Sequence, residues 1–191
     1  MPRLKAILAA RPVHHITDSG RIRAAVLIPV YWREGEFYVA FIQRTDRVST
    51  HKGQISFPGG SREPQDKSLA ETALRECAEE IGVAPESVEL IGELDDFPTH
   101  VTYYIISPFV GVIPWPYPFK ADAWETEEII EVPVSFLLDH HCRSEAPETV
   151  DGEHITTYFY TYKGRTIWGA TARILHEFLE LWEQAERRSG G

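Results

Sequence analysis

Residues 57–83 read FPGGSREPQDKSLAETALRECAEEIGV, and the interpretation of the whole chain depends on them. A Pro-Gly-Gly turn leads into a polar loop and then into strong helix formers, which predict a helix over residues 69–81. Asp66 and Ser68 are candidate N-caps, and Gly82 stands where such a helix would end. The apolar positions that share one face, and that we expect to be buried, are Leu69, Ala73, Leu74, Cys77 and Ile81.

Three glutamates crowd another side of the predicted helix. Glu76 and Glu80 are four residues apart and therefore share a face, and Glu79 borders that face. Like charges so close together repel, and a divalent cation would relieve the repulsion. Carboxylate oxygens suit Mg²⁺ or Mn²⁺, which commonly pair with substrate phosphates. The alternative is a solvated acidic face, because Glu-rich helices are common; the Gly-Gly turn and Gly82 favour the metal site.

This stretch resembles the Nudix box, the signature of the Nudix hydrolases, with the pattern G-x5-E-x7-R-E-U-x-E-E-x-G-U, where U is aliphatic. The residues in register are Arg75, Glu76, Glu79, Glu80, Gly82 and Val83, with Cys77 at the first aliphatic position. The front of the box departs from the pattern, because Gly60 lies one residue too far from Arg75. The family's early Glu therefore falls on Lys67, and Asp66 or Glu63 is left as the acid that could replace it.

The resemblance implies an α/β fold, the Nudix α/β/α sandwich, in which a mixed β-sheet has flanking helices. It covers most of the chain from about Arg21 onward, with the box at about residues 60–83. It also implies metal-dependent hydrolysis of a phosphoanhydride bond, with Mg²⁺ or Mn²⁺ as the cofactor. The implied metal ligands are Glu76, Glu79, Glu80 and the backbone carbonyl of Gly60, and the implied catalytic residues are these three glutamates and Arg75, which would orient them.

The segment before the box, residues 43–60 (QRTDRVSTHKGQISFPGG), is the most basic part of the chain. Arg44, Arg47, His51 and Lys52 supply its cationic or titratable groups. One interpretation is a solvated connecting loop. The functional interpretation is a loop that grips phosphate beside the metal site, with the planar guanidinium of Arg44 matching phosphate oxygens.

This loop resembles the one that precedes the box in coenzyme A pyrophosphatases, a Nudix subgroup, with the pattern L-L-T-x-R-S-x-x-L-x-x-H-x-G-Q-x-x-F-P-G-G. Arg44, His51, Gly53 and Gln54 fall at the pattern's positions, and Thr45 replaces its Ser. Members of the subgroup also have the longer spacing before the Arg of the box. The resemblance implies cleavage of coenzyme A or its derivatives into 3′,5′-ADP and 4′-phosphopantetheine. The candidate substrate-binding residues are Arg44, Arg47, His51 and Gln54.

Two other functions remain open at this point. The first is a Nudix hydrolase for another diphosphate, such as ADP-ribose, a dinucleotide or a modified nucleotide. The second is a non-catalytic Nudix module that binds nucleotides, although such modules usually lose acids of the box and this chain keeps all three. Glu125 and Glu128, which precede Val132 and Pro133, are either solvated strand residues or a further metal ligand or base.

Composition narrows the class of protein. The chain has 191 residues, enough for one domain over residues 1–191 with a substantial core. Its net charge of −10 argues against a nucleic-acid partner and leaves a small phosphorylated substrate possible. No apolar run approaches a membrane span, and the N-terminus is too interrupted for a signal peptide. Two cysteines make no disulfide framework, so we expect a cytoplasmic protein. A homodimer is left open.

Hydrophobic patterning predicts the remaining elements. Strands are expected over residues 21–32, 37–42, 87–95, 103–113, 154–162 and 165–168, with a surface helix over residues 1–11, a helical turn over 133–138 and an amphipathic helix over 169–187. Loops are expected over residues 115–124 and 140–149. Segment 167–175 is interpreted as core packing. A zinc site at His140, His141 and Cys142 is disfavoured, because no second ligand pair follows.

Overall fold

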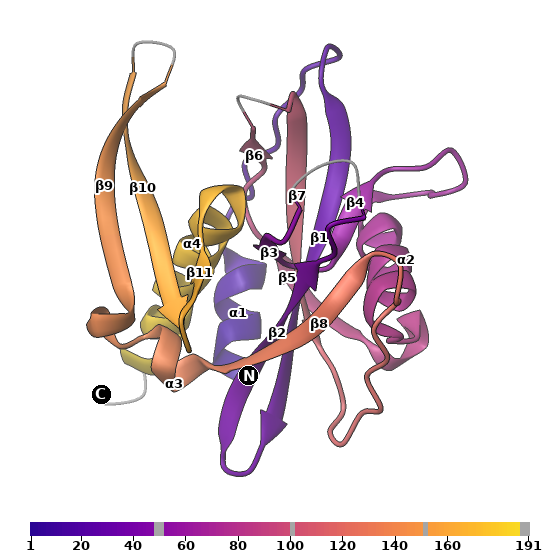
Figure 1. Ribbon diagram of the computed structural model, residues 1–191, viewed down its shortest axis with the longest axis vertical. Helices are drawn as coiled ribbons and strands as arrows, with labels where there is room; N and C mark the ends of the chain where they lie inside the picture. The colour runs from indigo at the N-terminus through magenta and orange to yellow at the C-terminus, as the bar shows by residue number, and fades with distance from the viewer. Residues whose placement is uncertain (48–51, 100–101, 151–152, 188–191) are drawn as a thin grey trace.

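The computed structural model describes residues 1–47, 52–99, 102–150 and 153–187 (Figure 1). The helices are α1 (Pro2–Ala10), α2 (Leu69–Ile81), α3 (Val134–Leu137) and α4 (Gly169–Arg187), with short 3₁₀ turns η1 (Pro85–Ser87) and η2 (His140–Cys142). The strands are β1 (Ile22–Arg33), β2 (Glu36–Arg44), β3 (Ile55–Ser56), β4 (Gly59–Ser61), β5 (Glu89–Glu93), β6 (Phe97–Pro98), β7 (Tyr104–Val112), β8 (Thr126–Pro133), β9 (Arg143–Val150), β10 (Glu153–Tyr162) and β11 (Arg165–Ile167).

A mixed eight-stranded sheet forms the centre of the fold, with β3-β2-β1-β7-β5 as its main path. β1 runs parallel to β7 and antiparallel to β2, so the strands expected over residues 21–32 and 37–42 are present and form a hairpin. β4 pairs with the first half of β1, which sets Gly60 opposite Ala25. β1 is buried on both faces for most of its length, as its unbroken apolar run predicts. The central strand therefore holds the glycine turn that precedes α2.

Helices cover both faces of this sheet (Figure 1). α2 packs on one face through Ala73, Cys77 and Ile81, which join a cluster with Leu27 of β1. α1 and α4 pack on the other face, where the larger core cluster lies. The predicted inner face of α4 is buried throughout: Ala172, Leu175, Phe178, Leu179 and Trp182. The expected α/β architecture, a mixed sheet with flanking helices, is confirmed.

The ends of α2 follow the predicted signals. Ser68 is the N-cap, and its hydroxyl accepts a hydrogen bond from the backbone N–H of Glu71 at 3.2 Å. Gly82 ends the helix in the left-handed region at φ 72°, which a residue with a side chain rarely adopts. Asp66 does not cap the helix, because its carboxylate is used elsewhere.

Two expectations about secondary structure are wrong. Residues 140–149 do not form a loop: a 3₁₀ turn is followed by β9, which pairs with β10 in a separate three-stranded sheet, β11-β10-β9. The strand is polar because most of its described side chains are exposed, so its sequence lacks an apolar pattern. The N-terminal helix is not confined to the surface, since Leu4, Ile7 and Leu8 are buried and α1 contacts α4 and β5.

Other expected elements are present. α3 supplies the predicted helical turn, and residues 115–124 carry no helix or strand. Cys77 and Cys142 are buried free thiols. Among the described helices, none combines the length and apolar character that crossing a membrane requires.

Candidate active site

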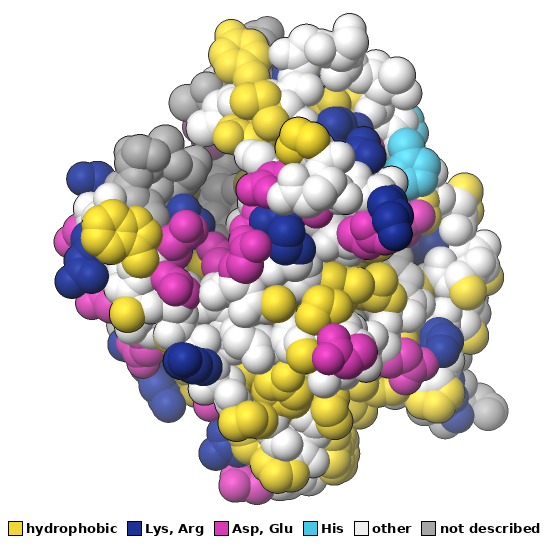
Figure 2. All heavy atoms as spheres, turned by 90° about the vertical axis from the view of Figure 1, so that its right-hand side faces the viewer, with side chains coloured by type: hydrophobic (Ala, Val, Ile, Leu, Met, Phe, Trp, Pro, Cys, Tyr) yellow, Lys and Arg dark blue, Asp and Glu magenta, His cyan; other side chains and the backbone are white. Residues whose placement is uncertain are grey.

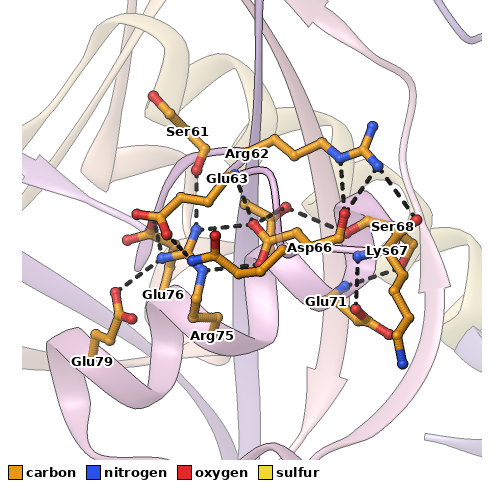
Figure 3. A network of polar contacts seen from close by, with 12 residues as sticks. Ser61, Arg62, Glu63, Asp66, Lys67, Ser68, Glu71, Arg75, Glu76 and Glu79 are labelled. Carbon is orange, nitrogen blue, oxygen red and sulfur yellow. Dashed lines mark hydrogen bonds and ion pairs between the residues drawn. The ribbon is translucent and has the colours of Figure 1, made fainter.

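The loop between β4 and α2 is tied to the helix by Arg75 (Figure 3). The guanidinium donates from Nε to Oδ1 of Asp66 and from Nη2 to Oδ2 of Asp66, both at 3.1 Å. It also donates to the carbonyl oxygen of Ser61 at 3.0 Å. Its Nη1 lies 2.9 Å from Oε1 of Glu76 and 3.0 Å from Oε2 of Glu79. One arginine therefore joins the loop acid to two glutamates of the box.

Asp66 is the acid that takes the position left open by the longer loop. Its side chain is almost fully buried, and it also accepts hydrogen bonds from the backbone N–H of Glu63 and the hydroxyl of Thr72, each at 2.9 Å. The bond from Arg75 is the main reason that the pKa of Asp66 falls to about 2. Glu63 itself is exposed and bonds to Gln65 instead.

Glu80 is the most deeply buried of the three box acids, with a relative exposure of 2%. Its Oε2 accepts the backbone N–H of Gly59 at 2.9 Å, and its Oε1 accepts Nη1 of Arg44 at 3.3 Å. Burial raises the pKa of Glu80 to about 8, although the Gly59 bond and Arg44 lower it. A buried carboxylate with two donors is held in one place and still lacks full charge compensation.

Glu76 lies against the glycine turn. A Cβ built on Gly60 would lie 2.6 Å from Cδ and 2.8 Å from Oε2 of Glu76, so only glycine allows the carboxylate to sit there. Burial raises the pKa of Glu76, while Arg75 lowers it. Glu79 differs, since its side chain is 59% exposed.

These groups provide the ligand types of a hard divalent cation. In the part of the chain that the structure describes, no three His, Cys, Asp or Glu side chains form a group that could already enclose an ion. Arg75 instead engages Oε1 of Glu76 and Oε2 of Glu79, while Arg44 engages Oε1 of Glu80 and the backbone N–H of Gly59 engages its Oε2. Glu80 is buried and Glu76 is partly buried, and a divalent cation would relieve the cost of their negative charge there, so the donor set fits the expected metal in its chemistry.

Glu125 and Glu128, the two candidate acids outside the box, have different surroundings in the structure. The charge of Glu125 helps to raise the pKa of both Glu76 and Glu80, so this acid contributes to the electrostatic surroundings of the box acids. Backbone bonds fix this loop: Asp122 N–H donates to the carbonyl of Glu80 at 3.0 Å, and Thr45 N–H donates to the carbonyl of Glu125 at 2.9 Å. Glu128 forms an ion pair with Arg165 at 2.5 Å and belongs to another part of the surface.

Of the four predicted substrate-binding residues, the three that the structure describes do not converge. Arg44 turns toward Glu80, whereas Arg47 donates to the carbonyl of Ala123 at 3.2 Å and lies over the ring of Trp124. Gln54 lines a separate cavity. His51 lies outside the described residues. Figure 2 faces the α2 side of the molecule and shows acidic side chains gathered there, with basic side chains beside them.

Comparison with known proteins identifies the family. The profile described as NUDIX domain matches residues 21–139, which is more than half of the chain. The chain belongs to the Nudix family. Proteins named uncharacterized Nudix hydrolase NudL resemble this Nudix protein over most of its length. The one from Photorhabdus laumondii is 32% identical over 169 residues, which span 88% of this chain and 89% of the relative. The one from Yersinia pestis is 32% identical over 167 residues, with shares of 87% and 82%.

Solved structures show the same fold. The MutT/nudix family protein from Enterococcus faecalis superposes with a TM-score of 0.58 at 13% identity, covering 98% of this chain and 70% of that chain. The C. elegans Ap4A hydrolase binary complex gives a TM-score of 0.51 at 15% identity, covering 61% and 83%. Because the sequence identity is so low, these matches establish the Nudix fold of this protein and carry no information about its substrate.

Two features of the site were not deduced from the sequence. The backbone N–H of Gly59 holds Glu80, and residues 120–125 bring Glu125 to the box acids. The role of Gly59 could have been suspected from the Gly59-Gly60 pair. Gly60 already has a role in the box pattern, which leaves the role of Gly59 to be explained. The second depends on long-range backbone pairing, for which a sequence gives no local signal.

Proposed function

We propose that this Nudix protein hydrolyses a phosphoanhydride bond in a nucleoside diphosphate derivative, and that its substrate is coenzyme A or a derivative of it. The products would be 3′,5′-ADP and 4′-phosphopantetheine. The observation that carries the proposal is the meeting of the box acids and an arginine from the segment before the box on one face of α2. Glu76, Glu79 and Glu80 all lie on α2, and Arg44, the last residue of β2, reaches Glu80 at 3.3 Å.

The proposed roles follow from the contacts. Nudix hydrolases generally use divalent metal ions; here Glu76, Glu79, Glu80 and the carbonyl of Gly60 would hold Mg²⁺ or Mn²⁺. The ion would supply polarisation of the phosphoryl oxygens and a bound water of lowered pKa. Arg75 orients Glu76 and Glu79 through its guanidinium, which Asp66 holds from the other side.

The remaining residues bind and place the substrate. Arg44 can exchange part of its contact with Glu80 for the diphosphate, because a guanidinium carries five donors in a planar fork. Glu125 acts electrostatically on Glu80, and we assign it the role of accepting a proton from the attacking water or of completing the ligand set. Arg47 is held by Ala123 and Trp124, so it contributes less to phosphate binding than the sequence suggests.

Product analysis tests the substrate. Purified protein is incubated with coenzyme A, ADP-ribose or Ap4A in Mg²⁺ and, separately, in Mn²⁺. Release of 3′,5′-ADP from coenzyme A, with little turnover of the others, is the expected result. Turnover of ADP-ribose or Ap4A alone would keep the phosphoanhydride chemistry and refute the coenzyme A assignment. No turnover of any of them would favour a different diphosphate or a nucleotide-binding module.

A further inference from the structure

A cavity lies away from the box acids, between the central sheet and the β10–β11 hairpin. Its volume is about 370 Å³, and its lining includes Gln43, Lys52, Gln54, Arg165, Thr166 and Trp168. β11 contacts β3 here. The cavity therefore lies between the basic segment that precedes the box and residues 165–168. The last two of these residues belong to segment 167–175, which was expected to pack in the core.

Trp168 departs from that core assignment. Its neighbour Ile167 is 1% exposed, whereas Trp168 is 47% exposed and faces the cavity. A large indole in this position loses the stabilisation that burial of its apolar surface would give. An exposed aromatic face beside cations is the arrangement that proteins use to stack a nucleic-acid base.

The cavity that Trp168 lines also contains hydrogen-bonding and cationic side chains, which are the groups that recognise a base edge and a phosphate. Gln43 and Gln54 carry carboxamides, which both donate and accept hydrogen bonds and so suit the edge of a purine. Lys52 and Arg165 add positive charge at the same cavity, in a chain whose net charge is −10. Glu128 contacts Nη2 of Arg165 at 2.5 Å and fixes the side chain; a guanidinium has further donors through which it can also bind a phosphate.

The backbone places this cavity on the opposite face of the sheet from the acids. Arg44 reaches Glu80 on the α2 face, and the preceding residue, Gln43, points to the other face because side chains alternate along a strand. The two sites share the base of one hairpin: Arg44 N–H donates to the carbonyl of Gln54 at 2.9 Å, and Gly53 N–H donates to the carbonyl of Arg44 at 3.1 Å.

We propose that this cavity binds a purine nucleoside phosphate, with the base on Trp168, the base edge at Gln43 and Gln54, and the phosphate between Lys52 and Arg165. The group can come from two sources. It is either the nucleotide half of the substrate, a reading that rests on the proposed function, or a free nucleotide that binds independently of hydrolysis. The binding itself depends only on the cavity.

Calorimetry tests the binding without hydrolysis. The Glu80→Gln protein is titrated in EDTA with adenosine, AMP and 3′,5′-ADP as probes. Affinity should rise with the number of phosphates. Trp168→Ala should weaken binding of 3′,5′-ADP by about fivefold or more, the range found when a stacked base loses its aromatic partner. Arg165→Met and Lys52→Met should reduce the difference between adenosine and 3′,5′-ADP.

Matched controls lie outside the cavity. Trp32→Ala removes an indole that is 52% exposed at the far end of β1, and Lys163→Met removes a cation from the turn beside β11. Both should leave the affinity for 3′,5′-ADP unchanged. Equal affinities for the wild type and Trp168→Ala, or the absence of saturable binding at millimolar nucleotide, would overturn the proposal.

Kinetics then distinguish the two sources. Raised KM for the hydrolysed substrate in Trp168→Ala and Arg165→Met, with kcat retained, assigns the cavity to the substrate's nucleotide half. Unchanged KM with lost calorimetric binding assigns it to a free nucleotide. If the protein hydrolyses none of the diphosphates tested, the proposed function fails, and the calorimetric result still decides whether the cavity binds a purine nucleoside phosphate.

Discussion

Replacing Asp66 by Asn should destabilise the protein through the bond to Arg75. The Asp66 carboxylate accepts from Nε and Nη2 of Arg75, the hydroxyl of Thr72 and the backbone N–H of Glu63. An amide has one acceptor oxygen, so the replacement loses the charge and leaves at least one of these donors facing an NH₂ group. Removing one partner of a buried ion pair costs about 3–5 kcal/mol.

The expected loss is smaller than that range, because Arg75 keeps Glu76, Glu79 and the carbonyl of Ser61. Bonds to charged groups contribute about 1.5–3 kcal/mol each, so we expect a free energy of unfolding lower by about 2–3 kcal/mol. Urea unfolding followed by circular dichroism measures it. The catalytic effect should be a decrease of about tenfold or more in kcat/KM, since the residues that orient metal-binding side chains act on this scale.

Two further measurements test whether the stability comes from the Asp66–Arg75 ion pair. Glu63→Gln changes the other acid of the loop, an exposed one, and should alter stability by less than about 0.5 kcal/mol. In a double-mutant cycle, Asp66→Asn and Arg75→Met should share a coupling energy of about 1 kcal/mol or more. Additivity of the two changes would show that the ion pair contributes nothing, and an equal effect of Glu63→Gln would show that the wrong acid had been chosen.

The same pair predicts how stability depends on pH. The pKa of Asp66 is about 2 in the folded protein, below the usual value of about 4 for an unfolded chain. A depressed folded pKa stabilises the protein above the unfolded value, and the contribution is lost as pH falls through the folded value. The difference in stability between wild type and Asp66→Asn should therefore shrink between about pH 4 and pH 2. A difference that stays constant across this window contradicts the assignment.

Further predictions concern the glycine turn and the two arginines. Gly59→Ala puts a Cβ 2.7 Å from the Cα of Val26, so it should lower the free energy of unfolding by about 1–3 kcal/mol. In Gly60→Ala the atoms nearest to the new Cβ belong to the Glu76 carboxylate rather than to the backbone, so thermal unfolding should change less than for Gly59→Ala, while the Mg²⁺ concentration for half-maximal activity rises by about tenfold or more; the reverse order would contradict the geometry. Arg44→Met should raise KM by about tenfold or more, as the loss of a charged hydrogen bond implies, whereas steady-state kinetics of Arg47→Met should stay within about threefold of wild type. Equal effects of the two arginine changes would show that the Arg44–Glu80 contact does not mark the substrate site.

Local signals in the sequence were sufficient for α2 and the hairpin before it. The Ser68 cap and Gly82 terminator are satisfied by bonds within a few residues, and β1 is apolar because both of its faces are buried. β9 was not predicted because most of its described side chains face solvent and give no apolar pattern. The strand forms because its backbone pairs with β10. The directions of side chains could not be predicted from the sequence either. Arg44 and Arg47 are both arginines of the basic segment, yet Arg44 contacts Glu80 and Arg47 lies over Trp124.

The site shows the same division. The spacing of the box placed three glutamates on one helix, but only the fold distinguishes buried Glu80 from exposed Glu79. The choice between Asp66 and Glu63 required the path of the loop, because the two acids are three residues apart and only one turns inward. Trp168 follows a buried Ile167, and no local pattern showed that it faces a cavity.

The proposed hydrolysis requires that the box acids bind the metal. The most direct measurement compares Mg²⁺-dependent hydrolysis of coenzyme A by the wild type, Glu79→Gln and Glu80→Gln, with Glu86→Gln as an exposed control outside the site. Circular dichroism verifies that each variant is folded. We expect Glu79→Gln and Glu80→Gln to lose metal-dependent turnover, while Glu86→Gln retains it. Full activity of both box variants would contradict it.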